Sequence, residues 1–508
     1  MSNTWVLPNL DIFIRFGKTL AKIILPNLNI FVRFGNMNTK ILIGRNAEIG
    51  LLESCATSKR SEFVVIYGRR RIGKTYLVNQ TFRDRFNFRY VGGHHLSESE
   101  QLRNFAVALV EYGRLSFEPL LKDWLDAFTL LQKILAASRS KKKIIFIDEM
   151  PWIDNPGSSF VKALENFWNG WASLRDDIVF IASGSATSWM ADHLFENQGG
   201  LHNRITAKIY LRPFNLSEVE CYVKRAGGNW DRYQIVEAYM VFGGVPFYYS
   251  LLDFNKSLAQ NIDSMFFAKN AQLSNEFNDL YYALFNSADK YLAIVRLLAS
   301  KPNGLTRDEI LKEIALQGGV LTKILLNLER SDFIQGSAAF GKKKKGILYK
   351  LTDFFSLFYL RFVEGNLTRD KHFWTHSLNT PTTNSWKGTA FENICLAHTD
   401  QIKNKLGIQG MLTSISSFKN ANAQIDLIID RADRTINLCE IKFCTDQYVI
   451  TKDYADKLRF RAAEFKQETK TRKGILNTFI TTFGVHNGSG NSLVNSEVVL
   501  DDLFVEAS

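Results

Sequence analysis

The sequence predicts an α/β fold in which helices cover both faces of a parallel sheet. Short apolar runs at residues 63–67, 144–147 and 178–182 alternate with longer stretches of helix-compatible residues. This alternation is typical of parallel sheets. The runs are continuously apolar, which indicates strands buried on both faces. The first run leads into a glycine-rich loop and the second ends in two acidic residues, and these two features organise the first half of the chain.

The glycine-rich loop matches the phosphate-binding pattern G-x-x-x-x-G-K-[S/T]. Its first glycine allows a sharp turn off the strand, and its second allows backbone N–H groups to approach phosphates. The lysine can reach the β- and γ-phosphates, and the threonine can offer its hydroxyl to Mg²⁺. A glycine-rich turn with a stray lysine is the alternative. We expect ATP with Mg²⁺ to bind to Gly68, Arg69, Arg70, Arg71, Ile72, Gly73, Lys74, Thr75 and Tyr76.

Downstream, an apolar run ends in Asp148 and Glu149. We expect Asp148, together with Thr75, to hold Mg²⁺, and Glu149 to polarise the attacking water, with Lys74 as the other catalytic group. A lone acidic residue after an apolar strand is a common pattern. Placed downstream of a phosphate-binding loop, it indicates nucleotide hydrolysis.

Two further residues are candidates for sensing the γ-phosphate. Ser183 ends the next buried strand, beside the acidic one, and a strand-ending turn with small residues is the alternative. Arg204 precedes another short strand and is a candidate finger that neutralises charge on the γ-phosphate. A surface arginine is the alternative reading of Arg204.

Composition limits the class of protein. The chain has 508 residues, with 46% hydrophobic and 22% charged, which predicts a globular protein of two to four domains. No run of 18 apolar residues predicts a membrane span. The five cysteines form no C-x-x-C pair, which favours reduced thiols and a cytoplasmic location. The net charge of +12 favours an anionic partner such as nucleic acid.

The N-terminal residues contain a repeat, because the pattern of residues 7–17 recurs at residues 25–35. We expect residues 1–36 to precede the real start at Met37; an amphipathic arm is the alternative. The domain plan assigns the following ranges: an N-terminal tail at 1–40, a phosphate-loop ATPase domain at 41–214, a helical lid at 215–285, a winged helix at 286–365, a linker at 366–385 and an α/β domain at 386–508.

The range 286–365 reads as three helices followed by a hairpin whose tip carries Lys342 to Lys345. Four lysines at a hairpin tip suit contact with DNA phosphates but carry no sequence specificity. A solvated loop, or a module that only spaces other proteins, is the alternative.

The C-terminal range carries a second constellation. Glu392 lies on an expected helix, Asp426 on a strand, and Glu440 and Lys442 on the next strand. Asp426 and Glu440 can face each other across a hairpin. The two carboxylates and the carbonyl of Ile441 could bind Mg²⁺, with Lys442 stabilising the attacking water. The alternative is an exposed, salt-bridged hairpin.

These motifs, with Ile43-Gly44-Arg45, Ser183-Gly184-Ser185 and Gly243-Gly244-Val245-Pro246, resemble the archaeal-type ATPase family, a branch of the AAA+/STAND-like P-loop ATPases. The resemblance covers about residues 41–508. It implies a winged helix and a C-terminal domain similar to PD-(D/E)XK nucleases, with Glu392, Asp426, Glu440 and Lys442 at the expected positions. The chain departs from that pattern at Ile425, where proline is usual.

Together these features predict an ATP-binding and ATP-hydrolysing switch or motor, coupled to a DNA-binding, nuclease-like C-terminal region. One alternative is a nucleotide-gated module that recruits a protein partner and cuts nothing. Another is an active ATP-dependent DNA nuclease. The sequence leaves an oligomer open, because an arginine finger supplied by a neighbouring copy would require one.

Overall fold

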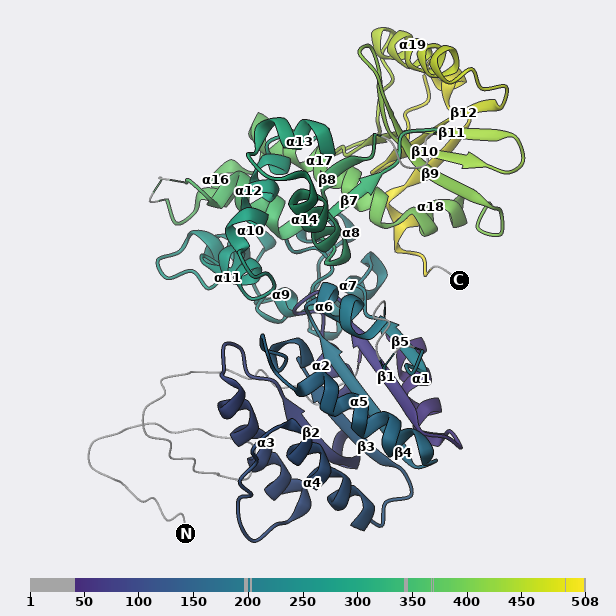
Figure 1. The fold of residues 1–508 in the computed structure, drawn as a ribbon. Coiled ribbons are helices and arrows are strands. Elements are labelled where there is room, and N and C mark those ends of the chain that lie inside the picture. The colour runs from purple at the N-terminus through teal and green to yellow at the C-terminus, as the bar shows by residue number, and fades with distance from the viewer. Residues whose placement is uncertain are drawn as a thin grey trace, which may run out of the picture. The chain divides into compact units, whose positions relative to one another are not determined.

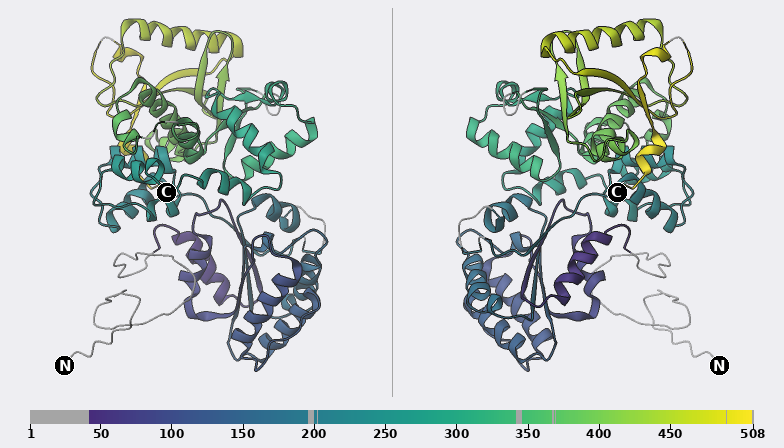
Figure 2. Two further views of the ribbon diagram at one scale, coloured as in Figure 1. Left: turned by 90° about the vertical axis from the view of Figure 1, so that its left-hand side faces the viewer. Right: turned by 90° about the vertical axis from the view of Figure 1, so that its right-hand side faces the viewer.

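The structure is a computed structural model (Figures 1 and 2). It describes residues 42–195, 200–201, 203–341, 346–366, 368, 370–488 and 490–506. The repeat at residues 7–35 and the lysines Lys342 to Lys345 lie outside the described residues. Among the described helices, none is long and apolar enough to cross a membrane.

The first half of the described chain is built on a five-stranded parallel sheet in the order β2-β3-β4-β1-β5 (Figure 1). Strand β4 lies between β1 and β3, with Ser183 opposite Ile66 of β1. The phosphate loop after β1 and the acidic pair after β3 therefore meet at one edge of the sheet. The parallel sheet predicted from the apolar runs is confirmed. Its strands are β1 (Glu62–Tyr67), β2 (Phe86–Val91), β3 (Lys143–Asp148), β4 (Ile178–Gly184) and β5 (Ala207–Tyr210).

Helices cover both faces of this sheet. Successive side chains of each strand point to opposite faces, and since both sets are apolar, each face needs a covering layer. Phe63 and Val65 of β1 pack in one cluster, and Val64 and Ile66 in the other. The aromatic residues of the helix Phe160–Gly170 are core residues, and the ring of Trp168 lies 4.9 Å from that of Phe63. The covering helices are α1 (Asn46–Thr57) and α2 (Lys74–Phe82) on one face, and α3 (Glu98–Gly113), α4 (Trp124–Ala137) and α5 (Phe160–Gly170) on the other.

Helices follow the sheet over the range predicted as a lid: α7 (Leu216–Arg225), α8 (Arg232–Phe242), α9 (Pro246–Ser250), α10 (Leu258–Ile262) and α11 (Glu276–Tyr282). The 286–365 segment then contains α12 (Ala288–Ala299), α13 (Arg307–Glu313), α14 (Gly318–Arg330) and α15 (Phe354–Phe358). Its short strands β6 (Leu305–Thr306), β7 (Ile334–Ser337) and β8 (Leu348–Leu351) form an antiparallel sheet in the order β6-β8-β7.

The C-terminal region has a second five-stranded sheet, in the order β13-β12-β11-β10-β9. The pairs among β9, β10 and β11 are antiparallel, and the pairs among β11, β12 and β13 are parallel. The elements are α17 (Pro381–Ala397), α18 (Thr399–Lys405), β9 (Thr413–Lys419), β10 (Gln424–Arg431), β11 (Thr435–Lys442), α19 (Lys452–Thr469), β12 (Gly474–Thr481) and β13 (Ser496–Val499).

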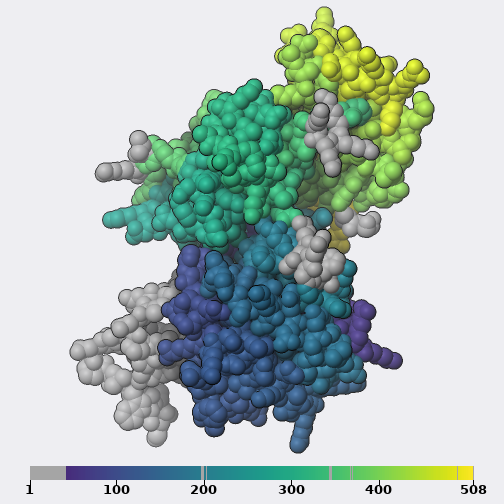
Figure 3. All heavy atoms as spheres, in the orientation of Figure 1, coloured from purple at the N-terminus to yellow at the C-terminus, as the bar shows by residue number. Residues whose placement is uncertain are grey.

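The predicted linker, residues 366–385, is partly ordered structure instead. Helix α16 (Phe373–Ser377) lies inside it, and α17 begins at Pro381. Trp374 is buried, and its backbone N–H donates to Asp263 at 2.8 Å. One apolar cluster contains residues from Phe214 to Phe504, so the elements that follow the first sheet share a core. In the space-filling view the teal and green segments of the chain adjoin (Figure 3).

His398 links the C-terminal region to the lid helices. Its Nε2 accepts the backbone N–H of Leu216 at 3.1 Å, and its Nδ1 lies 2.8 Å from the carbonyl oxygen of Ile394. A neutral imidazole with hydrogen on Nδ1 satisfies both contacts. Burial lowers the pKa of His398 to about 4, so the folded protein holds this side chain uncharged.

We expect this histidine to make stability fall in mild acid. Its pKa is about 6.5 when unfolded and lower when folded, so the unfolded state binds the proton more readily and stability drops as pH falls from about 6.5 towards 4. The loss should reach about 3 kcal/mol. In urea unfolding over that pH range, the free energy of unfolding of His398→Gln should depend less on pH than that of the unaltered protein. His376→Gln, at an exposed imidazole, should leave the pH dependence intact; an unchanged slope in His398→Gln would contradict the assignment.

Candidate functional site

The phosphate loop joins β1 to α2 in a conformation that two glycines permit. Gly73, at the N-terminal end of α2, has φ 90°, and no side chain caps the first N–H groups of the helix. Gly68 has φ 137°, and a Cβ there would lie 2.4 Å from the carbonyl oxygen of Leu211. The unpaired amides at the start of α2, with the positive end of its dipole, form a site that suits phosphate.

Lys74 folds back onto this loop. Its Nζ donates to the carbonyl oxygens of Gly68 and Arg69, both at 2.9 Å. Burial lowers the pKa of Lys74, and the nearby carboxylates of Glu149 and Asp148 oppose that shift. The buried ammonium group and the uncapped amides lie together, so the residues present fit a polyphosphate.

The predicted metal and sensor residues are also brought together. Thr75 Oγ1 donates to Asp148 Oδ2 at 2.6 Å, and the Ser183 hydroxyl donates to the other oxygen of the same carboxylate. Hydroxyl and carboxylate oxygens are the ligands that Mg²⁺ prefers, so these residues fit the ion. Glu149 accepts the backbone N–H of Ser185 at 3.1 Å and its hydroxyl at 2.8 Å, which holds the expected base against the end of β4.

Arg204 is not brought to this site. Thr206 donates its backbone N–H to Phe63, at the start of β1, and Ala207 pairs with Val64. Arg204 therefore lies at the amino edge of the sheet, whereas the phosphate loop lies at the carboxyl edge, about 17 Å of strand away. Arg204 is therefore too far away to act as a finger within its own chain, because a residue that precedes a parallel strand is at the opposite edge from the strand ends that build the site. A finger supplied by a neighbouring copy stays a prediction.

The side chains of the three loop arginines contact other protein side chains and do not point to the expected phosphate position. Arg69 is buried, forms an ion pair with Asp353 and lies 5.0 Å from the ring of Phe333. Arg71 binds Glu276 at 2.6 Å, and Arg70 lies 5.9 Å from the ring of Trp152. These contacts do not support the expectation that the side chains of the three arginines bind the nucleotide. Asp353 and Glu276 were missed by the sequence analysis because no motif marks them.

A second group of segments is joined through Arg45 and Phe214. Arg45 Nη2 donates to the carbonyl oxygen of Arg212 at 2.6 Å, and its guanidinium lies 5.0 Å from the ring of Phe214. Phe214 in turn donates its backbone N–H to Gly244 at 2.7 Å. Burial lowers the pKa of Arg45, and Glu218 opposes that shift. Gly244 belongs to the range predicted as the lid, so these contacts join the start of the described chain to that range.

The C-terminal candidate residues also gather. The β10–β11 register, in which Leu427 faces Cys439, sets Asp426 opposite Glu440. Lys442 Nζ lies 2.8 Å from Glu440 Oε1. Burial raises the pKa of Glu392, and the charge of Asp426 raises it further, which places Glu392 within electrostatic reach of the other two carboxylates. We call Glu392, Asp426, Glu440 and Lys442 the carboxylate cluster.

Cations already face this cluster. Lys350 of β8 lies 2.6 Å from Asp426 Oδ1, and Arg461 lies 2.8 Å from Glu440 Oε2. The other oxygen of Glu440, Oε1, accepts a hydrogen bond from the Tyr454 hydroxyl. Within the described ranges, no three acidic, histidine or cysteine side chains are arranged to hold a metal ion. The oxygen donors are of the right chemical type, but in this arrangement the cluster does not fit Mg²⁺. Lys350 was missed because it lies 76 residues from Asp426 in sequence.

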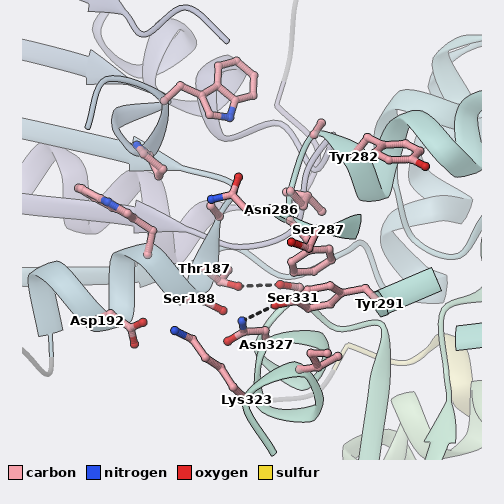
Figure 4. Close-up of a pocket in the computed structure, with 18 of the residues that line it drawn as sticks. Thr187, Ser188, Asp192, Tyr282, Asn286, Ser287, Tyr291, Lys323, Asn327 and Ser331 are labelled. Atoms are coloured by element: carbon pink, nitrogen blue, oxygen red, sulfur yellow. Dashed lines mark hydrogen bonds between the residues drawn. The ribbon is translucent and has the colours of Figure 1, made fainter. Parts of the chain in front are cut away.

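A cavity of about 760 Å³ lies between the loops after β3 and β4 and the 286–365 segment (Figure 4). At its margin Thr187 and Ser331 share a hydrogen bond of 2.9 Å. Asn327 of α14 donates to the hydroxyl of Tyr291 at 2.8 Å. None of residues 68–75 lines it, so it is separate from the phosphate loop. No sequence motif predicted it.

Comparison with known proteins agrees with the first half of this description. A family model described as an ATPase domain predominantly from Archaea matches residues 42–252. An uncharacterized protein of Methanocaldococcus jannaschii is 26% identical over 340 residues, which is 64% of this chain and 70% of that protein. Residues 42–252 are thus an archaeal-type ATPase domain of the P-loop class, as the resemblance implied.

Solved structures of similar proteins include a Walker-type ATPase of Pyrococcus abyssi. It is 18% identical, with a TM-score of 0.47 over 63% of this chain and 96% of its own. The ORC2 protein of Aeropyrum pernix, solved as ADPNP–ADP complexes, is 14% identical, with a TM-score of 0.41 over 64% of this chain and 94% of its own.

The buried Arg69–Asp353 pair gives a stability prediction. Asp353→Asn leaves the arginine buried without its counter-ion, and we expect a loss of about 3–5 kcal/mol in the free energy of unfolding. Urea unfolding followed by tryptophan fluorescence measures this. Asp279→Asn, at an exposed carboxylate of α11, should change stability by less than about 0.5 kcal/mol. Equal stability of the two variants would show that Asp353 does not carry the charge balance of Arg69.

Proposed function

We propose that the protein is an ATP-hydrolysing switch in which the nucleotide state of the phosphate loop is passed to the lid and the C-terminal half. The observation that carries the proposal is the direction of the loop arginines. Arg69 reaches Asp353 and Arg71 reaches Glu276, so the loop that binds phosphate also grips the segments that follow the ATPase domain.

Hydrolysis follows from the groups at the carboxyl edge of the sheet. Lys74 balances charge on the β- and γ-phosphates, and Ser183 lies where it can donate to the γ-phosphate. Mg²⁺, held by Thr75 and Asp148, supplies further neutralisation of phosphate charge. Glu149 polarises the attacking water. For this it must leave Ser185, whose N–H and hydroxyl it now accepts.

The switch arises because the Lys74 ammonium group has three N–H donors, of which two now bind carbonyl oxygens. To bind both the β- and the γ-phosphate it must give up at least one of these contacts. Its ammonium group now donates to Gly68 and Arg69. When phosphate takes over these hydrogen bonds, the carbonyl of Arg69 loses its partner and the backbone at Arg69 is free to reorient. The Arg69–Asp353 pair then has a different strength with and without nucleotide. Such a difference in contacts is what allows a ligand to shift a conformational equilibrium.

DNA is the partner that the charge of the chain favours. The net charge is +12, and basic proteins bind nucleic acid through phosphate contacts. The proposed contact surface is the winged-helix arrangement expected at residues 286–365 together with the C-terminal region. We also propose a cytoplasmic location. We further propose an oligomer in which Arg204 of one copy reaches the nucleotide site of its neighbour.

A second candidate function is metal-dependent DNA cleavage at the carboxylate cluster. Its support is the proximity of Asp426, Glu440 and Lys442, which the β10–β11 register and a 2.8 Å ion pair bring together. In that reading Glu440 and Asp426 would hold the metal once the cations that now face them had moved away, and Lys442 would stabilise the attacking water. A nucleotide-gated module that recruits a partner and cuts nothing remains the competing function.

The ATPase proposal predicts separate effects for two substitutions. Lys74→Ala removes the cation that balances the phosphates, so ATP binding measured by calorimetry should fall below detection. Glu149→Gln keeps the shape but not the base, so binding should persist while kcat falls by about 10²–10⁴-fold. Lys208→Ala, at an exposed lysine of β5, should leave both unchanged. Full turnover by Lys74→Ala would refute the assignment of the loop.

The cleavage proposal is tested on DNA with Mn²⁺, with and without ATP. If the cluster cuts, Glu440→Ala should lose at least about 10²-fold in rate, since a metal ligand is removed. Glu468→Ala, at an exposed carboxylate of α19, should cut like the unaltered protein. Equal cleavage by the two variants would place any cutting elsewhere, and no cleavage by the unaltered protein would favour the recruiting module.

A further inference from the structure

We propose that Lys350 is a built-in cation that keeps the carboxylate cluster closed to a divalent metal ion, and that the phosphate loop controls its position. Lys350 lies on β8 of the 286–365 segment, outside the C-terminal region. Its Nζ is 2.6 Å from Asp426 Oδ1, and its side chain is only 11% exposed. Gln424 donates to the same carboxylate oxygen at 2.9 Å.

The charges at the cluster are balanced without a metal ion. Three carboxylates, those of Glu392, Asp426 and Glu440, are faced by three cations. Lys442 and Arg461 each lie 2.8 Å from Glu440, and Lys350 takes Asp426. A divalent ion that used Asp426 and Glu440 would add two positive charges at this short range, which like-charge repulsion opposes. One of the three cations must withdraw before such an ion binds.

Lys350 is the cation that can withdraw. Lys442 and Arg461 belong to β11 and α19 of the C-terminal region itself. Lys350 is carried by the β7–β8 hairpin, which belongs to a different segment of the chain, although its neighbour Leu351 packs in the apolar core that the two segments share. Phe340 donates its backbone N–H to Ser417 of β9 at 3.0 Å, and its ring lies 4.9 Å from that of Phe465. Movement of the hairpin would uncover Asp426 and leave the second sheet intact.

The same strand is tied to the phosphate loop. Asp353 follows Lys350 by three residues, forms the ion pair with Arg69 and accepts the backbone N–H of Ser356 at 2.9 Å. The short stretch from Lys350 to Asp353 thus forms two ion pairs: its lysine binds Asp426, and its aspartate binds Arg69 of the phosphate loop. A change at Arg69 on nucleotide binding moves the strand that carries Lys350. This second step rests on the proposed function, whereas the role of Lys350 as the closing cation does not.

Mn²⁺ binding to the nucleotide-free protein tests the first step without relying on cleavage. In titrations followed by electron paramagnetic resonance, Lys350→Met should bind Mn²⁺ about tenfold more tightly than the unaltered protein, because the competing charge is gone. Lys350→Arg keeps the charge and should bind as the unaltered protein does. The double variant Lys350→Met/Asp426→Asn should lose the gain.

Lys473→Met is the matched control, since Lys473 forms an ion pair with Asp430 of the same strand but faces no member of the cluster. It should leave Mn²⁺ affinity unchanged. Circular dichroism and a melting curve show that each variant is folded. Unchanged affinity in folded Lys350→Met, or an equal gain in Lys473→Met, would overturn the proposal.

Hydrogen–deuterium exchange tests the link to the nucleotide. The comparison is made with and without ATP, under conditions in which calorimetry shows that ATP binds. Amides of residues 346–353 should exchange at least about threefold faster with ATP if β8 is released. Bound ATP with unchanged exchange in this stretch would overturn the link. A protein that binds no ATP would instead refute the proposed function, so the two failures are distinguishable.

Discussion

The buried ion pair between Arg69 and Asp353 is the constraint on which the account depends. A guanidinium with this little exposure is retained only because a carboxylate neutralises it. That carboxylate belongs to the N-cap residue of α15, two residues after β8 and far along the chain, so the phosphate loop takes up its conformation against a segment outside the ATPase domain. The aromatic ring of Phe333 completes the enclosure. Any ligand that reshapes the loop must therefore act on this contact, which gives the nucleotide site a physical route to the rest of the protein.

The arrangement of apolar cores determines how such a signal would travel. The first sheet has its own core on each face. The helices and strands that follow share a further cluster that runs from Phe214 to Phe504. Packed interiors resist continuous deformation and move as units. A change at the phosphate loop should therefore move packed segments as units. The movement should occur where the segments meet through polar contacts, which are the ion pairs of Arg69, Arg71 and Lys350.

The sequence predicted the parallel sheet, and the grouping of Lys74, Thr75 and Asp148 at one edge of it, because both leave local signals. A continuous apolar run marks a strand buried on both faces, and Lys74, Thr75 and Asp148 occupy fixed positions after such runs. It misplaced Arg204, because the residue type fitted a finger while the direction of the strand put it at the far edge. It assigned residues 366–385 to a linker because that range is rich in Pro, Asn, Thr and Ser, whereas α16 and the start of α17 lie there and Trp374 is buried. Asp353 and Lys350 could not be found at all, since each acts through a partner far away in sequence.

The most direct test is a crystal structure with Mg²⁺ and a non-hydrolysable ATP analogue. The account predicts that Lys74 Nζ binds phosphate oxygen, that its bonds to Gly68 and Arg69 are broken, and that the Arg69–Asp353 pair is separated or rearranged together with β8. A structure in which Lys74 holds the phosphates while Arg69–Asp353, Arg71–Glu276 and Lys350–Asp426 all keep their present geometry would contradict it.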